Sequence, residues 1–100
     1  MKSSFEKFKK ATQKAKEIKY LGFSEVFDIE ENCEKLIENA RNMILIDYEL
    51  NSYNTSKIEL INKNSKEIIT LRRNSNVKCV KNDNDEYIFN NNGFIFYIKF

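Results

Sequence analysis

The chain offers few of the side chains that enzymes use for covalent chemistry. It has no His, so it cannot supply a Ser-His-Asp or Cys-His pair. Its two cysteines, Cys33 and Cys79, fall on apolar periodic positions, where a reduced thiol behaves as a small buried hydrophobe. Two distant Cys also fall short of the ligands that zinc needs. We therefore expect no catalytic residues, no metal site and no cofactor.

Loops that bind nucleotides or calcium are not predicted either. The two glycines, Gly22 and Gly93, are isolated, so neither a P-loop nor a dinucleotide-binding loop can form. The acidic run at 83–86 lacks the central Gly and the distal Glu of a calcium loop. We interpret this run as a solvated turn.

One enzymatic alternative keeps some support, a small ribonuclease toxin. Arg72 and Arg73, with Lys78 nearby in sequence, could stabilise a scissile phosphate. Paired carboxylates at Asp47 and Glu49 share a strand face, which alternation normally turns toward water. This alternative ranks below two binding functions.

Charge is segregated along the chain. The segment 1–20 carries seven Lys against two Glu, whereas the segment 25–50 carries eight acids against two bases, and the net charge of +2 hides this division. In the acidic segment, four carboxylates form a stripe opposite the apolar face of a predicted helix: Glu30, Glu31, Glu34 and Glu38.

This acidic stripe has two interpretations. Like charges four residues apart destabilise a helix, so the stripe would gain from pairing with the basic first helix. Alternatively, it competes for a positively charged groove on a nucleic-acid-handling or defence enzyme. The second interpretation predicts a non-enzymatic small protein-binding inhibitor, anti-CRISPR-like or immunity-protein-like. A phage or mobile-element source fits the Asn-, Lys- and Ile-rich composition, which AT-rich coding DNA favours.

The first helix suggests a nucleic-acid-binding accessory protein as the alternative. Lys7, Lys10 and Lys14 lie opposite its apolar stripe and could contact phosphates without reading sequence. Against this stand the scarcity of Arg, with three residues, and the lack of a basic strand interleaved with aromatics. The plainer interpretation is a solvated helix face.

The last hairpin supplies a third candidate surface. On its outer face, Ile88, Ile95 and Tyr97 would make an apolar patch, which marks an interface where it is exposed and contiguous. A protein partner or a homodimer could use this patch. The alternative is that the helices of the chain itself cover it.

Two helices are predicted to hold these charged stripes. Ser3 and Glu6 match a capping box before a helix at 4–20, which Gly22 would close. Asp28 and Glu31 repeat the box before a helix at 29–42.

The second half predicts strands. Alternation over 43–50 favours a first strand, and β-prone runs separated by Asn-rich turns then favour an antiparallel meander. The dipeptide Asn92-Gly93 suits a type I′ turn, which fixes the register of the last hairpin. The expected cross-strand pairs are Ile58 with Leu71, Leu60 with Ile69, Tyr87 with Ile98, Ile88 with Tyr97, Phe89 with Phe96 and Glu86 with Lys99.

The expected fold class is α+β. Two N-terminal helices would pack on a C-terminal antiparallel meander of four to six strands, in one domain over 1–100. The basic start lacks the apolar stretch of a signal peptide, and no apolar run approaches the length of a membrane span. A cytoplasmic location is the default expectation.

Overall fold

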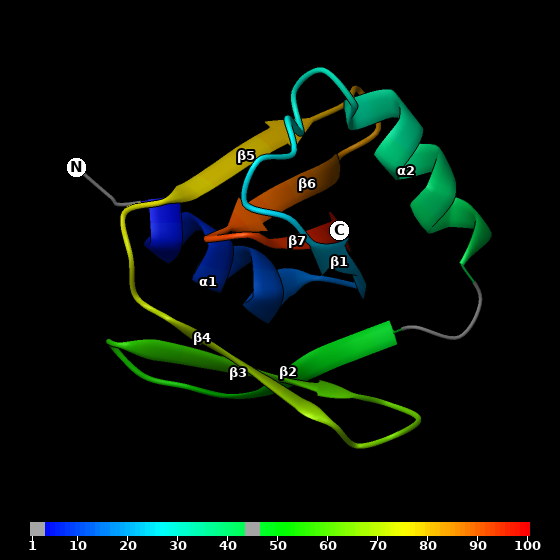
Figure 1. Cartoon of the computed structure of the whole chain (residues 1–100). Coiled ribbons are helices and arrows are strands. Elements are labelled where there is room, and N and C mark those ends of the chain that lie inside the picture. The colour runs from blue at the N-terminus through cyan, green and yellow to red at the C-terminus, as the bar shows by residue number, and fades with distance from the viewer. Residues whose placement is uncertain (1–3, 44–46) are drawn as a thin grey trace.

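The computed structural model describes residues 4–43 and 47–100. Within these ranges the chain forms one antiparallel sheet of seven strands with a helix on each face (Figure 1). The elements are α1 (Ser4–Lys14), β1 (Glu17–Phe23), α2 (Cys33–Asn42), β2 (Asp47–Tyr53), β3 (Lys57–Asn62), β4 (Ile68–Arg72), β5 (Val77–Lys81), β6 (Glu86–Asn91) and β7 (Phe94–Lys99).

The strand order across the sheet is β4-β3-β2-β1-β7-β6-β5. The strands curl around α1, which lies between β5–β7 on one side and β2–β4 on the other (Figure 1). The α+β class is confirmed. The described residues form seven strands rather than the predicted four to six. The two helices are also not consecutive, because β1 lies between them in the sequence and at the centre of the sheet.

The predicted helix at 4–20 is too long. It ends at Lys14, and Glu17–Phe23 continue as β1, because Ile18 pairs with Ile98 on one side and Tyr48 on the other. The prediction of Gly22 as a helix cap is also wrong. Gly22 lies at a bulge in β1 with φ +132°, a conformation that favours glycine. Ser3, the first half of the predicted capping box, lies outside the described residues.

The predicted helix at 29–42 begins four residues late, at Cys33. The carboxylate of Asp28 accepts hydrogen bonds from the backbone N–H groups of Glu30 (3.0 Å) and Glu31 (3.1 Å). These bonds form a turn over 29–32 that leads into the helix. Asp28 therefore satisfies backbone donors as predicted, but at a turn before α2 rather than at its first residue.

The predicted hairpin registers are confirmed. All six expected cross-strand pairs occur, in β3–β4 and in β6–β7. At the tip of the last hairpin both turn residues have positive φ, 51° at Asn92 and 102° at Gly93. The strand predicted at 43–50 is β2, which runs later, over Asp47–Tyr53; residues 44–46 of the prediction lie outside the described ones.

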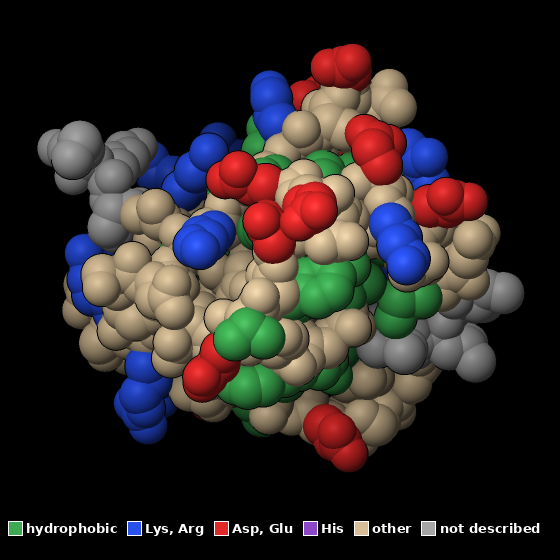
Figure 2. Space-filling model, turned by 45° about the horizontal axis from the view of Figure 1, so that its top comes forward, with side chains coloured by type: hydrophobic (Ala, Val, Ile, Leu, Met, Phe, Trp, Pro, Cys, Tyr) green, Lys and Arg blue, Asp and Glu red, His purple; other side chains and the backbone are tan. Residues whose placement is uncertain are grey.

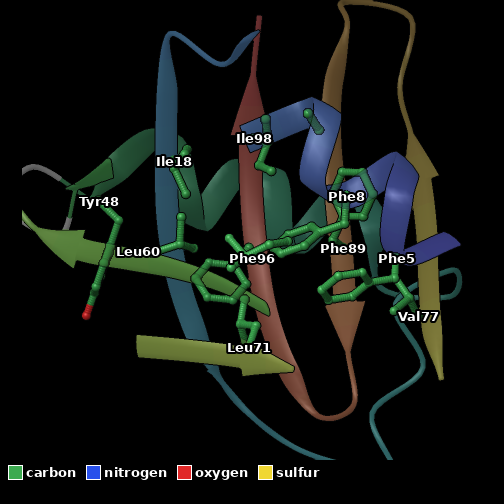
Figure 3. Packing of buried hydrophobic residues seen from close by; sticks show 12 residues of the cluster. Phe5, Phe8, Ile18, Tyr48, Leu60, Leu71, Val77, Phe89, Phe96 and Ile98 are labelled. Atoms are coloured by element: carbon green, nitrogen blue, oxygen red, sulfur yellow. The ribbon is translucent and has the colours of Figure 1, made fainter. Parts of the chain in front are cut away.

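Alternation along the strands gives the sheet two apolar faces. On one face α1 inserts Phe5 and Phe8 toward Phe89 and Phe96, and Figure 3 shows these rings together with residues from both ends of the sheet. The rings of Phe8 and Phe89 meet edge to face at 5.1 Å. On the other face α2 and the preceding turn cover a smaller cluster of Ile29, Ile37, Ala40, Ile88, Ile95 and Tyr97.

Candidate functional site

The four predicted acidic residues lie together on the surface at α2. Glu30 and Glu31 project from the turn before the helix, and Glu34 and Glu38 from the helix itself; all four are exposed. Ile29 and Ile37 anchor this segment, since each is 1% exposed. Because these buried residues face the sheet, the carboxylates between and after them face outward. We call Glu30, Glu31, Glu34 and Glu38 the acidic surface.

These carboxylates do not pair with the basic first helix. The sheet separates α1 from α2, because each helix packs on a different face (Figure 1). None of the three ion pairs between described residues includes a member of the acidic surface. The interpretation of the stripe as one half of a helix–helix charge pairing is therefore wrong.

A buried carboxylate holds α2 in place beneath this surface. Glu86 on β6 is 2% exposed and forms an ion pair with Arg41 of α2. Its carboxylate also accepts hydrogen bonds from the Tyr97 hydroxyl (2.6 Å) and the Asn82 amide (2.9 Å). Hydrogen bonding to Arg41 outweighs burial and lowers the pKa of Glu86 to about 2. Burial and the bond to Glu86 raise the pKa of Tyr97.

A second anchor lies at the C-terminal end of α2. The ammonium of Lys19, on β1, donates to the carbonyls of Ala40 (2.9 Å) and Met43 (2.7 Å). The Ala40 carbonyl also accepts a hydrogen bond from the backbone N–H of Met43 (3.2 Å), the C-cap residue. A cation at this end of the helix also interacts favourably with the helix dipole. The buried ammonium of Lys19 thus has two carbonyl acceptors within the fold. Both anchors therefore hold the C-terminal end of α2, and the buried Ile29 and Ile37 pack the preceding part of the segment against the sheet.

Exposed apolar side chains lie beside the acidic surface, and the sequence prediction missed them. Val26 is 94% exposed and Phe27 is 38% exposed. They line a polar hollow of about 340 Å³ together with Glu25, Asp28, Ile29, Glu30, Asn76, Lys78 and Asn90. Figure 2 shows acidic side chains gathered on this side of the molecule next to exposed hydrophobic ones. The signal in the sequence that could have predicted this surface is the pair Val26-Phe27, which lies between the acidic residues Glu25 and Asp28.

The predicted patch on the last hairpin is not a free surface. Ile88, Ile95 and Tyr97 do share one face, but they are 0%, 5% and 1% exposed. The turn before α2 and the helix cover them with Ile29, Ile37 and Ala40. β6 and β7 also lie inside the sheet, so neither is an edge available for strand addition. The prediction of this patch as a partner-binding site is wrong.

The predicted basic residues lie on the other side of the sheet. Lys7, Lys10 and Lys14 are exposed on α1, away from the buried Phe5 and Phe8. Lys9 differs, because its ammonium pairs with Glu6 at 3.1 Å. Lys7, Lys10 and Lys14 therefore remain a candidate phosphate-binding face.

The residues of the ribonuclease alternative are not brought together. Arg73 pairs with Glu6 and lies over the ring of Phe5, with its guanidinium carbon 5.9 Å from the ring centroid. Arg72 and Arg73 line one hollow, whereas Lys78 lines the hollow beside Val26.

Neither cysteine has the environment of an activated thiol. Cys33 and Cys79 are free, half-buried and packed against different apolar clusters. Burial is the main cause of the raised pKa of each thiol, so the nucleophilic thiolate is disfavoured. Over the described ranges, no cluster of three or more His, Cys, Asp or Glu residues could hold a metal ion.

Comparisons of the chain with protein-family models, with curated proteins and with solved structures found no match. In the part of the chain that the structure describes, no helix is both long and apolar enough to cross a membrane.

Proposed function

We propose that this chain is a non-enzymatic protein-binding inhibitor that docks through the acidic surface and the adjacent Val26 and Phe27. The observation that carries the proposal is their combination on one side of the molecule: four exposed carboxylates next to apolar side chains that no core requires. Interfaces commonly combine an apolar anchor with a polar rim, and the charges of the rim steer association.

The chemistry of the surface defines the partner. Four carboxylates complement a positively charged groove, which is the groove that enzymes acting on nucleic acid present to phosphates. The proposed partner is therefore a nucleic-acid-handling or defence enzyme whose groove the inhibitor occupies. An anti-CRISPR-like or immunity-protein-like role in a phage or mobile element follows from this proposal. Cytoplasmic action follows as well, since such targets work there.

Rigidity supports this use of α2. Arg41 and Lys19 fix the C-terminal end of the helix at the sheet, and the buried Ile37 packs its middle there, so the backbone that carries the carboxylates is held before a partner arrives. A surface that is organised in advance loses less side-chain and backbone entropy on binding.

The proposal is tested by affinity capture from a lysate of the source organism, read by mass spectrometry with and without nuclease treatment. The test variant replaces all four carboxylates of the acidic surface with Gln. The matched control removes four exposed carboxylates elsewhere: Glu49→Gln, Glu67→Gln, Asp83→Asn and Asp85→Asn. The wild type and the control should retain a basic protein after nuclease treatment, and the test variant should lose it.

The captured protein then allows a kinetic test. Removing the four charges should slow association about tenfold or more at low salt and flatten its salt dependence, because exposed charges act mainly on the on-rate. Replacing Val26 and Phe27 with Ser should instead speed dissociation, since buried apolar anchors act on the off-rate. Equal capture by the test variant, or capture that nuclease abolishes, contradicts the proposal.

A further inference from the structure

A groove of about 190 Å³ lies between α1 and the sheet, on the side opposite the acidic surface. Three lysines line it from the helix, Lys7, Lys10 and Lys14, with Ala11 between them. Aromatic residues line it from the sheet: Tyr87, Phe89 and Phe100. No acidic side chain belongs to this lining. We call it the basic groove.

The lysines reach the groove because of helical spacing. Positions 7, 10 and 14 fall on one side of a helix, and over seven residues they extend about 10 Å along it. All three are exposed, and no ion pair between described residues includes them. Their positive charges therefore add along the groove rather than being neutralised within the fold.

The aromatic wall combines one stacked pair of rings with one edge-to-face contact. Tyr87 lies parallel to the buried Phe89, with ring centroids 6.1 Å apart and an interplanar angle of 16°. Phe100 meets Tyr87 edge to face at 5.1 Å. The ammonium of Lys81 lies 6.0 Å from the centroid of the Tyr87 ring. Tyr87 and Phe100 are only half-buried, so parts of these rings remain accessible beside the lysines.

We infer that the basic groove binds single-stranded nucleic acid, with phosphates along Lys7, Lys10 and Lys14 and an unpaired base against Tyr87 and Phe100. Aromatic rings beside a cationic track are how proteins bind single strands without reading sequence. A duplex would offer the phosphates but keep its bases stacked inside, so the rings would have no use. The site shares no residue with the acidic surface and stands without the proposed inhibitor function.

The test is fluorescence anisotropy of labelled single strands of about 12 nucleotides, oligothymidylate and oligouridylate, against a duplex of equal length. The wild type should bind both single strands more tightly than the duplex. Three phosphate contacts predict a slope of log K against log salt of about −2. The variant Lys7→Gln, Lys10→Gln, Lys14→Gln should bind about tenfold or more weakly at 50 mM salt and show a slope near zero.

A matched variant separates the effect of the groove lysines on binding from the effect of the net charge of the protein. Lys35→Gln, Lys63→Gln and Lys78→Gln remove the same charge from exposed sites outside the groove, so binding should stay close to that of the wild type. Equal weakening by the two triple variants would show that net charge alone drives binding and would overturn the inference. Absence of wild-type binding at 50 mM salt would also overturn it.

The aromatic contribution needs its own variant. Tyr87→Leu should weaken single-strand binding about fivefold to a hundredfold, the range for one stacked base, and leave binding of inorganic polyphosphate unchanged. Because Tyr87 packs on Phe89, thermal unfolding is measured in parallel, and Phe100→Leu at the groove rim repeats the test should Tyr87→Leu unfold. Equal binding of duplex and single strand, or unchanged binding by both folded ring variants, would overturn the inference.

Discussion

Glu86 shows how one buried charge can determine where a helix lies. Its carboxylate pairs with Arg41 and accepts hydrogen bonds from Tyr97 and Asn82. These three partners come from three different segments of the chain. A buried ion is tolerated only where its hydrogen-bonding capacity is used, and removing one partner leaves a costly unpaired charge. The network therefore acts as a specific lock between α2 and the β6–β7 hairpin.

This lock makes stability depend on pH. The pKa of Glu86 is about 2 in the folded chain and near 4.5 when the side chain is free, so the carboxylate stabilises the fold above pH 4.5. That contribution is lost as the pH falls from 4.5 to 2, and the difference in pKa corresponds to roughly 3 kcal/mol. We predict that Glu86→Gln lowers the free energy of unfolding at pH 7 by about 2 kcal/mol.

Urea unfolding at a series of pH values measures both effects. The wild type should lose more stability than Glu86→Gln between pH 4.5 and 2, so their curves converge toward low pH. Asp83→Asn removes an exposed carboxylate from the turn that precedes β6 and serves as the control. Parallel curves for the wild type and Glu86→Gln would contradict the role given to this carboxylate.

The sequence predicted the cross-strand pairing of Glu86 with Lys99 but not the ion pair of Glu86 with Arg41. Local turn chemistry at Asn92-Gly93 fixes the hairpin register, and every residue of both strands follows from it. The partner Arg41 is 45 positions away, and no spacing rule relates it to Glu86. Short-range patterns thus predict cross-strand neighbours, whereas side chains that meet across the core depend on the packing of whole elements.

At the scale of elements, β1 is the segment that the sequence prediction missed. Apolar residues at Phe5, Phe8, Ala11, Ala15 and Ile18 continue a helical period through a segment that becomes a strand. The competing signal was the alternation of Ile18 and Tyr20 with Lys19 and Leu21. Burial decides between the two periods, because a central strand can place Ile18 and Tyr20 on one apolar cluster and Leu21 on the other.

Because β1 was not predicted, the packing of the two helices on opposite faces of the sheet was not predicted either. With a strand inserted between them, α1 and α2 pack on opposite faces of the sheet, and the polar Lys19 becomes a buried cap for α2. Both hydrogen bonds of this cap join a charged donor to helix-end carbonyls, a type of bond that contributes about 1.5 to 3 kcal/mol. The cap should therefore control how readily α2 leaves the sheet.

We predict that Lys19→Met accelerates amide hydrogen exchange in α2 by about tenfold to a hundredfold, which corresponds to 1.5 to 3 kcal/mol. Amides of β3 and β4 should exchange as in the wild type, because these strands do not contact α2 through Lys19. Lys16→Met, at an exposed position, is the control. Unchanged exchange in α2, or uniform acceleration through the whole sheet, would show that Lys19 is not a specific anchor.

At the scale of the whole molecule, segregation of charge in the sequence becomes segregation between two sides of the sheet. The acidic surface lies on α2 and its preceding turn, and the basic groove lies along α1. The sequence predicted both charged faces correctly as exposed. It could not predict that the sheet would keep them apart, since that depends on β1.

The position of the acidic surface explains how the fold tolerates it. Glu30, Glu31 and Glu34 lie before or within the first turn of α2, where the helix dipole favours negative charge. Glu34 and Glu38 remain the like-charge pair with α-helical spacing, and such a pair costs about 0.2 to 0.5 kcal/mol. The two effects oppose each other, so no charge from α1 is needed to balance the surface.

We therefore predict that changing Glu30, Glu31, Glu34 and Glu38 to Gln together alters the free energy of unfolding by less than about 1 kcal/mol. Each of the three charges near the N-terminus loses a dipole interaction at the low end of about 0.3 to 1 kcal/mol, because all three are exposed and salt screens them. Relief of the like-charge repulsion, about 0.2 to 0.5 kcal/mol, offsets part of this loss. Thermal unfolding at 0.15 M salt, where the Debye length is about 8 Å, is the measurement. Combining these changes with Lys7→Gln, Lys10→Gln and Lys14→Gln should give the sum of the two separate effects, because the sheet lies between the two sets. A fall in melting temperature of more than about 8 °C in the Glu variant, restored by the added Lys changes, would show that the two helices interact through their charges.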